Sequence, residues 1–155
     1  MDSEISFQLK SAAFSNGSPI PEKYTCKDQN INPPLTISGV PDGTTSLALI
    51  MHDPDAPSGD YLHWTIWNLS PDLASINENK VPEGAVEGIN DFGKVGYGGP
   101  CPPAGTHHYL FVLFALDTKL DVTRGAKREE VSEAITDHTI TQTTLVGVFT
   151  SPASI

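Results

Sequence analysis

Hydrophobic residues come in short runs along this chain, and most of these runs predict β-strands. Residues 5–9 alternate between apolar and polar side chains, as in a strand with one buried face. Residues 47–51 are continuously apolar and predict a strand buried on both faces. Residues 63–69 are rich in aromatic and β-branched side chains, which favour strands. Residues 109–116 are the most hydrophobic segment and are expected to form the central strand, with residues 145–150 as a closing strand.

One segment has the spacing of an amphipathic helix. Its i, i+3, i+4 and i+7 positions hold Val131, Ala134, Ile135 and His138. Glu129 and Glu130 precede these positions, where the helix dipole favours acidic side chains. Because His138 falls on the apolar face, we expect it to be a hydrogen-bonded core histidine.

Glycine and proline divide the chain into short segments. There are thirteen of each among 155 residues, about 17% of the chain against a usual 12%. They concentrate in residues 15–34 and 83–105, which predict long loops, and a loop as long as the second is often functional. Many strands, one late helix and proline-rich turns predict a mainly β fold, an antiparallel β-sandwich with a C-terminal α-helix. The length suits one domain, residues 1–155.

The charge of the chain excludes some classes of partner. Nine basic and nineteen acidic residues give a net charge of −10, which disfavours binding to nucleic acid or, unaided, to anionic membranes.

No apolar run approaches the roughly 20 residues of a transmembrane segment. The start of the chain lacks the features of a secretory signal, so we expect a cytoplasmic location. Cys26 and Cys101, 75 positions apart, are then expected to be two thiols.

Three polar segments fall at the ends of predicted strands. They are the acidic loop 53–57, His63 at the start of a strand, and the glycine- and proline-rich segment 99–109. If neighbouring strands pair, Asp53, His63 and His107 line one small cavity with proline and tyrosine walls. Imidazole N–H groups and loop amides would hold an anion there. Asp53 would orient His63 by binding its far nitrogen.

Each segment also has a structural explanation. Asp-Pro-Asp is common in turns, a lone strand histidine is often only hydrogen-bonded, and Gly-Pro-Cys-Pro-Pro suits a rigid loop. Trp64 and Trp67 are expected to pack within the sheet. A metal-assisted hydrolase is an alternative, with ligands drawn from His52, Asp53, Asp55, His63, His107 and His108. The chain has no HExxH motif, nucleophile elbow or phosphate-binding loop to support an enzyme.

These segments resemble the phosphatidylethanolamine-binding protein (Raf kinase inhibitor protein) family, in the form of its bacterial and archaeal branch. The main matches are Asp53-Pro54-Asp55-Ala56-Pro57-Ser58-Gly59, His63-Trp64 through Asn68, and Gly99-Pro100-Cys101-Pro102-Pro103-Ala104-Gly105-Thr106-His107. Further matches are Tyr24-Thr25-Cys26, Asn32-Pro33-Pro34-Leu35 and Leu145-Val146-Gly147. Together they cover nearly the whole chain.

The resemblance implies a Greek-key-like β-sandwich with an anion pocket, no cofactor and no metal. The pocket would bind phosphate-type groups, including the phosphoethanolamine head group of a lipid. Its residues would be Asp53, Pro57, Tyr61, His63, Gly99, Pro102, Pro103, His107 and Tyr109. The family also suggests a cis bond before Pro57, a homodimer, and a kinase or a protease as protein partner.

The chain departs from the family pattern at three positions. His108 replaces an arginine after the second pocket histidine, His52 replaces an aspartate, and Ile37 replaces a tryptophan. Loss of the arginine removes a fixed charge and a planar donor fork, so we expect a looser loop. The sequence thus favours a non-enzymatic regulatory binding protein, with the hydrolase and a protease inhibitor acting through an exposed loop as alternatives.

Overall fold

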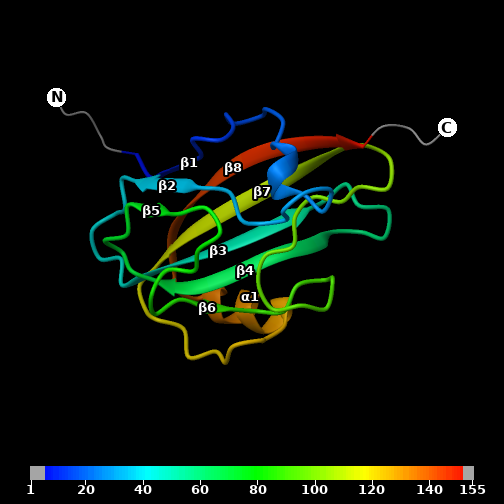
Figure 1. Ribbon diagram of the computed structural model, residues 1–155. Coiled ribbons are helices and arrows are strands. Elements are labelled where there is room, and N and C mark those ends of the chain that lie inside the picture. The colour runs from blue at the N-terminus through cyan, green and yellow to red at the C-terminus, as the bar shows by residue number, and fades with distance from the viewer. Residues whose placement is uncertain (1–5, 152–155) are drawn as a thin grey trace.

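The computed structural model describes residues 6–151, which form two antiparallel β-sheets and one α-helix (Figure 1). The smaller sheet has the strand order β1-β2-β5, with bounds Gln8–Lys10, Leu35–Ser38 and Ser75–Ile76. The larger sheet has the order β6-β4-β3-β7-β8, with bounds Val86–Glu87, Tyr61–Leu69, Ser46–Asp53, Gly105–Leu116 and Thr139–Ser151. The short 3-10 helix η1 is Glu22–Tyr24. The prediction of a mainly β antiparallel sandwich is confirmed.

The large sheet is covered on both faces. The small sheet and the N-terminal loops pack on one face, and helix α1, Arg128–Thr136, lies on the other (Figure 1). Each face has its own hydrophobic cluster. Trp64 belongs to the cluster between the sheets and Trp67 to the cluster under the helix, and both are fully buried as expected. Burial on both faces explains the continuous apolar run in β3.

The strand order corrects one prediction. The middle strand of the large sheet is β3, and the predicted central segment, β7, lies between β3 and β8. The error arises because β3 and β7 are both buried on two faces, so hydrophobicity alone does not rank them. Strand β8 begins at Thr139, earlier than predicted, because its first half is a mostly exposed polar edge strand. Strand β1 begins at Gln8, and Ile5 lies outside the described residues.

The predicted helix is present, but His138 is not part of it. Helix α1 ends at Thr136, and its buried positions are Val131 and Ile135. The His138 side chain is 45% exposed, and its Nδ1 lies 2.7 Å from the Asp117 carboxylate. The expectation of a core histidine is therefore wrong, because the chain leaves the helix before the position i+7 is reached.

The two cysteines form a disulfide bond. Cys26 and Cys101 are joined, with their Cα atoms 5.5 Å apart. The prediction of two thiols is therefore wrong for this structure. It failed because 75 positions of sequence separation say nothing about the distance between two loops, which depends on how both are folded against the sheet.

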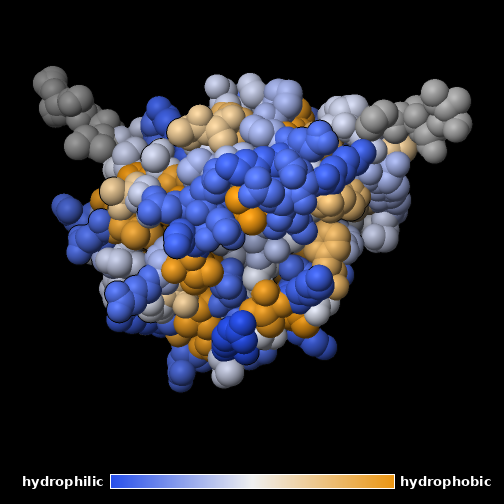
Figure 2. All heavy atoms as spheres, in the orientation of Figure 1, coloured by the Kyte–Doolittle hydropathy of each residue, from blue (hydrophilic) through white to orange (hydrophobic). Residues whose placement is uncertain are grey.

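On the face shown in Figure 2, the surface is mainly hydrophilic and its hydrophobic residues form small separated patches. Among the described residues, three large hydrophobic side chains are exposed: Val81, Phe92 and Ile140. Phe92 lines a cavity at one end of the large sheet. In the part of the chain that the structure describes, no helix is long and apolar enough to cross a membrane.

Candidate functional site

A cavity of about 220 Å³ lies at one end of the large sheet. Eight of the nine predicted pocket residues line it: Asp53, Pro57, Tyr61, His63, Pro102, Pro103, His107 and Tyr109. They come from the loop after β3, the start of β4, and the segment that leads into β7. The structure thus brings three distant segments of the chain together, as the sequence predicts.

Strand pairing explains this convergence. Strand β3 is antiparallel to both β4 and β7, so its last residue, Asp53, lies opposite Tyr61 at the start of β4. His107 and Tyr109 lie near the start of β7, beside the same end of β3. Because side chains alternate along a strand, these two share a face and both line the cavity, whereas His108 points the other way.

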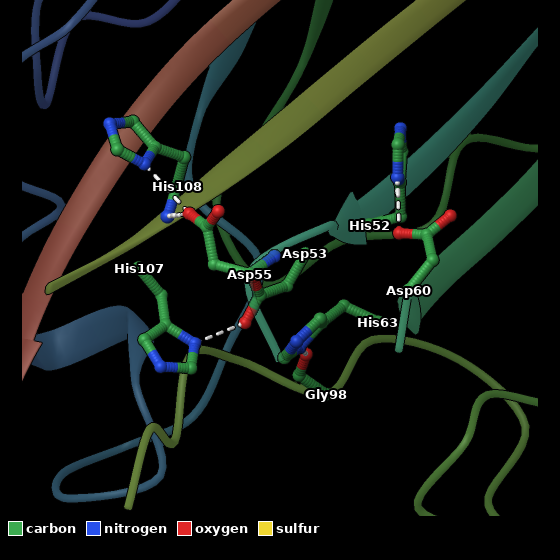
Figure 3. Close-up of polar contacts among 8 residues, drawn as sticks. All are labelled: His52, Asp53, Asp55, Asp60, His63, Gly98, His107 and His108. Carbon is green, nitrogen blue, oxygen red and sulfur yellow. Dashed lines mark hydrogen bonds and ion pairs between the residues drawn. The ribbon is translucent and has the colours of Figure 1, made fainter. Parts of the chain in front are cut away.

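The buried carboxylate of Asp53 orients His107. The Nδ1 of His107 donates to Oδ2 of Asp53 over 2.6 Å, and the two side chains are only 8% and 4% exposed (Figure 3). The other carboxylate oxygen accepts the backbone N–H of Asp55. With Nδ1 engaged, Nε2 is the nitrogen that the ring offers to the cavity. The prediction that Asp53 orients His63 is therefore wrong, since its partner is His107.

His63 is held instead by a backbone carbonyl. Its Nδ1 lies 2.6 Å from the carbonyl oxygen of Gly98, which only accepts hydrogen bonds, so Nδ1 carries a proton (Figure 3). Burial lowers the pKa of His63, and the hydrogen bond to Gly98 offsets only part of this effect. His63 is thus disposed to be neutral in the free protein, with the Nε2 lone pair directed away from its carbonyl partner.

Aromatic rings surround His63. The ring centroids of Tyr61, Phe92 and Tyr109 lie 5.3, 5.4 and 5.2 Å from that of His63, each in an edge-to-face arrangement. Such packing fixes the imidazole plane, because the ring has no room to rotate between its neighbours. It also accounts for the low polarity of the environment that lowers the pKa of His63.

The Tyr109 hydroxyl is buried without a hydrogen-bond partner among the described residues. A buried hydroxyl in this state carries a free-energy cost, which a ligand or water can relieve. Burial raises the pKa of Tyr109, and the nearby Asp53 carboxylate acts in the same direction. The hydroxyl therefore keeps its proton and is a hydrogen-bond donor without a protein acceptor, on a residue that lines the cavity.

Gly99, the ninth predicted residue, does not line the cavity. A Cβ at this position would lie 2.1 Å from the carbonyl oxygen of Tyr24, so only glycine fits. Its N–H donates to the side chain of Asn30 over 2.8 Å. Gly99 therefore joins two loops behind the cavity, and its contact with a ligand stays a prediction.

Two further corrections concern the cavity wall. The described residues contain no cis peptide bond, so the expected cis bond before Pro57 is absent. Sequence reasoning also missed four lining residues: Ala56, Ser58, Phe92 and Cys101. The sequence does carry a signal for Phe92, because it is a large apolar residue in a glycine-rich loop.

The remaining histidines pair with separate carboxylates. His108 donates its Nδ1 and its backbone N–H to Asp55, over 2.7 and 2.8 Å, so an imidazole takes the position of the family arginine. The Nδ1 of His52 lies 2.7 Å from Asp60 (Figure 3). Among the described residues, no three His, Cys, Asp or Glu side chains are placed to hold a metal ion. The six candidate ligands therefore do not form such a group, although Asp53, His63 and His107 line one cavity, and the hydrolase alternative gains no support from this geometry.

Comparison with known proteins places this arrangement in a family. The phosphatidylethanolamine-binding protein family model matches residues 10–150. The UPF0098 protein of Methanothermobacter thermautotrophicus is 48% identical over 146 residues, which cover 91% of this chain and 97% of that protein.

Two crystal structures have the same fold as this chain. A phosphatidylethanolamine-binding protein homologue from Chlamydia trachomatis has a TM-score of 0.90 and 41% identity, and the match covers 96% of this chain and 99% of that one. E. coli YbcL, described as a member of the mammalian PEBP family, has a TM-score of 0.89 and 34% identity, with the same coverage. The chain therefore belongs to the phosphatidylethanolamine-binding protein family.

Proposed function

We propose that the protein is a non-enzymatic binding protein whose cavity takes a small phosphate-type anion, either free or as the head group of a larger ligand. The observation that carries this proposal is the arrangement of His63 and His107. Each ring has its Nδ1 engaged by a buried acceptor, which leaves Nε2 for the cavity. The Tyr109 hydroxyl, which has no partner among the described residues, adds a hydrogen-bond donor.

The cavity suits an anion whose binding is accompanied by protonation of His63. Burial disfavours the charged form of His63, so the empty cavity is poor in positive charge. A bound anion would stabilise the imidazolium of His63, and Nε2 would then donate to it. The Asp53 carboxylate keeps His107 in the tautomer that presents Nε2. Binding is thus coupled to proton uptake.

The family name suggests that the occupant carries phosphate, and phosphoethanolamine is the head group to test. The size of the cavity, about 220 Å³, accommodates such a group but not a whole lipid. A regulatory role through a kinase or a protease, formation of a homodimer and a cytoplasmic location all stay predictions.

Isothermal titration calorimetry with inorganic phosphate and with O-phosphoethanolamine at pH 6 tests the proposal. We expect His63→Asn and His107→Asn to weaken binding at least about tenfold, since each removes a charge-assisted hydrogen bond. His138→Asn is the matched control, because that exposed histidine pairs with Asp117 outside the cavity. Circular dichroism should show that all three variants are folded.

Ethanolamine without phosphate serves as the ligand control and should not bind. Equal affinity of the wild-type protein and both cavity variants for phosphate would contradict the proposal. Competition between ethanolamine and phosphoethanolamine at equal strength would also contradict it, because recognition would then not depend on the anion.

A further inference from the structure

Two loops distant in sequence are bonded together behind the cavity. The Tyr97 hydroxyl donates to the carbonyl oxygen of Tyr24 over 2.7 Å. Two residues further on, the N–H of Gly99 donates to Asn30, and a Cβ at Gly99 would overlap the Tyr24 carbonyl. The segment 24–30 therefore acts as a support for the segment 97–101.

The disulfide is the last of these attachments before the two prolines that line the cavity. The backbone N–H of Cys26 donates to the carbonyl oxygen of Pro100 over 3.1 Å, and the side chain of Cys26 is bonded to Cys101. Pro102 and Pro103 both line the cavity, and we call these two residues the proline wall. The sulfur bridge thus ends at the residue immediately before the two prolines that shape the cavity.

The proline wall has few attachments of its own. Proline has no backbone N–H, so neither residue donates a hydrogen bond. In the described part of the chain, no hydrogen bond joins residues 102–104 to another segment. The next anchor is Gly105, which opens β7 and pairs with Ser151 of β8. The wall is therefore held between a covalent bond on one side and a strand on the other.

Both cysteines are exposed in this structure, and Cys101 also lines the cavity. An external thiol can therefore reach the bridge, and exposed disulfides are the ones that exchange most readily. If a thiol cleaves the bridge, the aromatic and proline packing around the cavity would remain. The segment 101–104 would lose its covalent attachment to Cys26.

We propose that the Cys26–Cys101 disulfide is a positioning element of the anion cavity, and that its reduction by a dithiol loosens the proline wall and weakens anion binding. This inference rests on the proposed function. In the reaction, a thiolate of the dithiol attacks one sulfur, the S–S bond breaks, and the released cysteine thiolate takes up a proton. The second thiol of the reductant then displaces the other cysteine. The protein gains two electrons and two protons, and the reductant becomes a disulfide.

The physical reason for the effect is preorganisation. A wall held in its bound position before the ligand arrives costs little conformational entropy on binding. A wall released at Cys101 must be ordered again when the ligand binds. Before the ligand binds, water enters the cavity of the reduced protein more freely. The reduced protein should stay folded, since neither hydrophobic cluster contains Cys26 or Cys101.

Phosphate titration calorimetry on the oxidised, dithiothreitol-reduced and reoxidised protein tests this inference. We expect affinity to fall about tenfold on reduction and to return on reoxidation. The double variant Cys26→Ser/Cys101→Ser should match the reduced protein and be insensitive to dithiothreitol. Val131→Ala controls for general destabilisation, because Val131 is a buried residue of helix α1 that packs in the cluster under the helix and does not line the cavity. It should lower the thermal stability but leave phosphate affinity unchanged.

Hydrogen–deuterium exchange without ligand separates the two proposals. We expect reduction to accelerate exchange at the amides of residues 101 and 104–107. Faster exchange in a protein that binds phosphate in neither state would overturn the proposed function but support the loosened wall. Equal phosphate affinity in both states with unchanged exchange would overturn this inference and leave the proposed function standing.

Discussion

His107 and His108 are neighbours on β7, yet they form two very different ion pairs. Each places its Nδ1 on an aspartate of the same loop, at 2.6 Å from Asp53 and 2.7 Å from Asp55. The side chains of the first pair are 8% and 4% exposed, whereas those of the second are 54% and 42% exposed. Strand alternation alone turns one histidine into the cavity and the other to solvent.

The comparison shows that the residue types in an ion pair do not by themselves decide how much the pair contributes to stability. An exposed pair is screened by water and contributes about 0–1 kcal/mol to stability. A buried pair is different, because removal of one partner leaves the other without compensation in a medium of low polarity. The same two residue types therefore support a site in one place and only a surface contact in the other.

The largest expected effect comes from breaking the buried pair. Asp53→Ala should lower the free energy of unfolding at pH 7 by about 3 kcal/mol, since His107 and the Asp55 N–H both lose their acceptor. Asp55→Ala is the matched control and should cost less than about 1 kcal/mol. Urea denaturation measures both. Equal losses in the two variants would show that burial does not distinguish the pairs.

The second prediction concerns pH and the other buried imidazole. Burial lowers the pKa of His63 in the free protein, and a bound anion would raise it again. Affinity should therefore be highest below the lowered pKa and fall as the pH rises. Each unit by which the anion raises that pKa gives about a tenfold change in affinity. Calorimetry with dimethyl phosphate, whose charge is constant between pH 5 and 8, measures the effect.

His63→Asn is the control for this pH dependence and should flatten the curve. Titration in buffers of different ionisation enthalpy should show proton uptake by the wild-type protein. An affinity that is the same at pH 5.5 and pH 8 would mean that neither cavity histidine changes its charge on binding.

The smallest expected effect is at the exposed pair. His108→Arg should change the free energy of unfolding at pH 6 by less than about 0.5 kcal/mol, because arginine can also bind Asp55 at the surface.

The exposed pair should also contribute to stability in a pH-dependent way. The hydrogen bond from His108 lowers the pKa of Asp55, so the contribution of the Asp55 carboxylate to stability is present at neutral pH and is lost as acid protonates the carboxyl. Urea denaturation from pH 2 to pH 8 should show the difference from Asp55→Ala vanish in acid. A persistent difference would assign the effect to packing.

Much of the fold could be predicted from local patterns. The continuous apolar run 47–51 predicted β3, and the spacing of Val131 and Ile135 predicted α1. Both predictions succeed because burial on a strand or a helix face leaves a periodic mark in the sequence. The polar first half of β8 leaves no such mark, so its start was missed.

The candidate site was predictable for a different reason. Motif residues at the ends of strands that pair must meet at one end of the sheet, so Asp53, His63 and His107 could be placed together from their order alone. Their mutual bonding could not. Asp53 binds the Nδ1 of His107, whereas the Nδ1 of His63 binds the backbone carbonyl of Gly98.

By itself, the sequence determined the strands, the helix and the set of polar residues that converge on one cavity, since these follow from periodicity and from position along the chain. Only the tertiary structure decided which acceptor each imidazole binds, that Gly99 packs behind the cavity, and that Cys26 meets Cys101. These features depend on distances of a few ångströms between loops, and those distances are set by the packing of the whole molecule rather than by any local pattern.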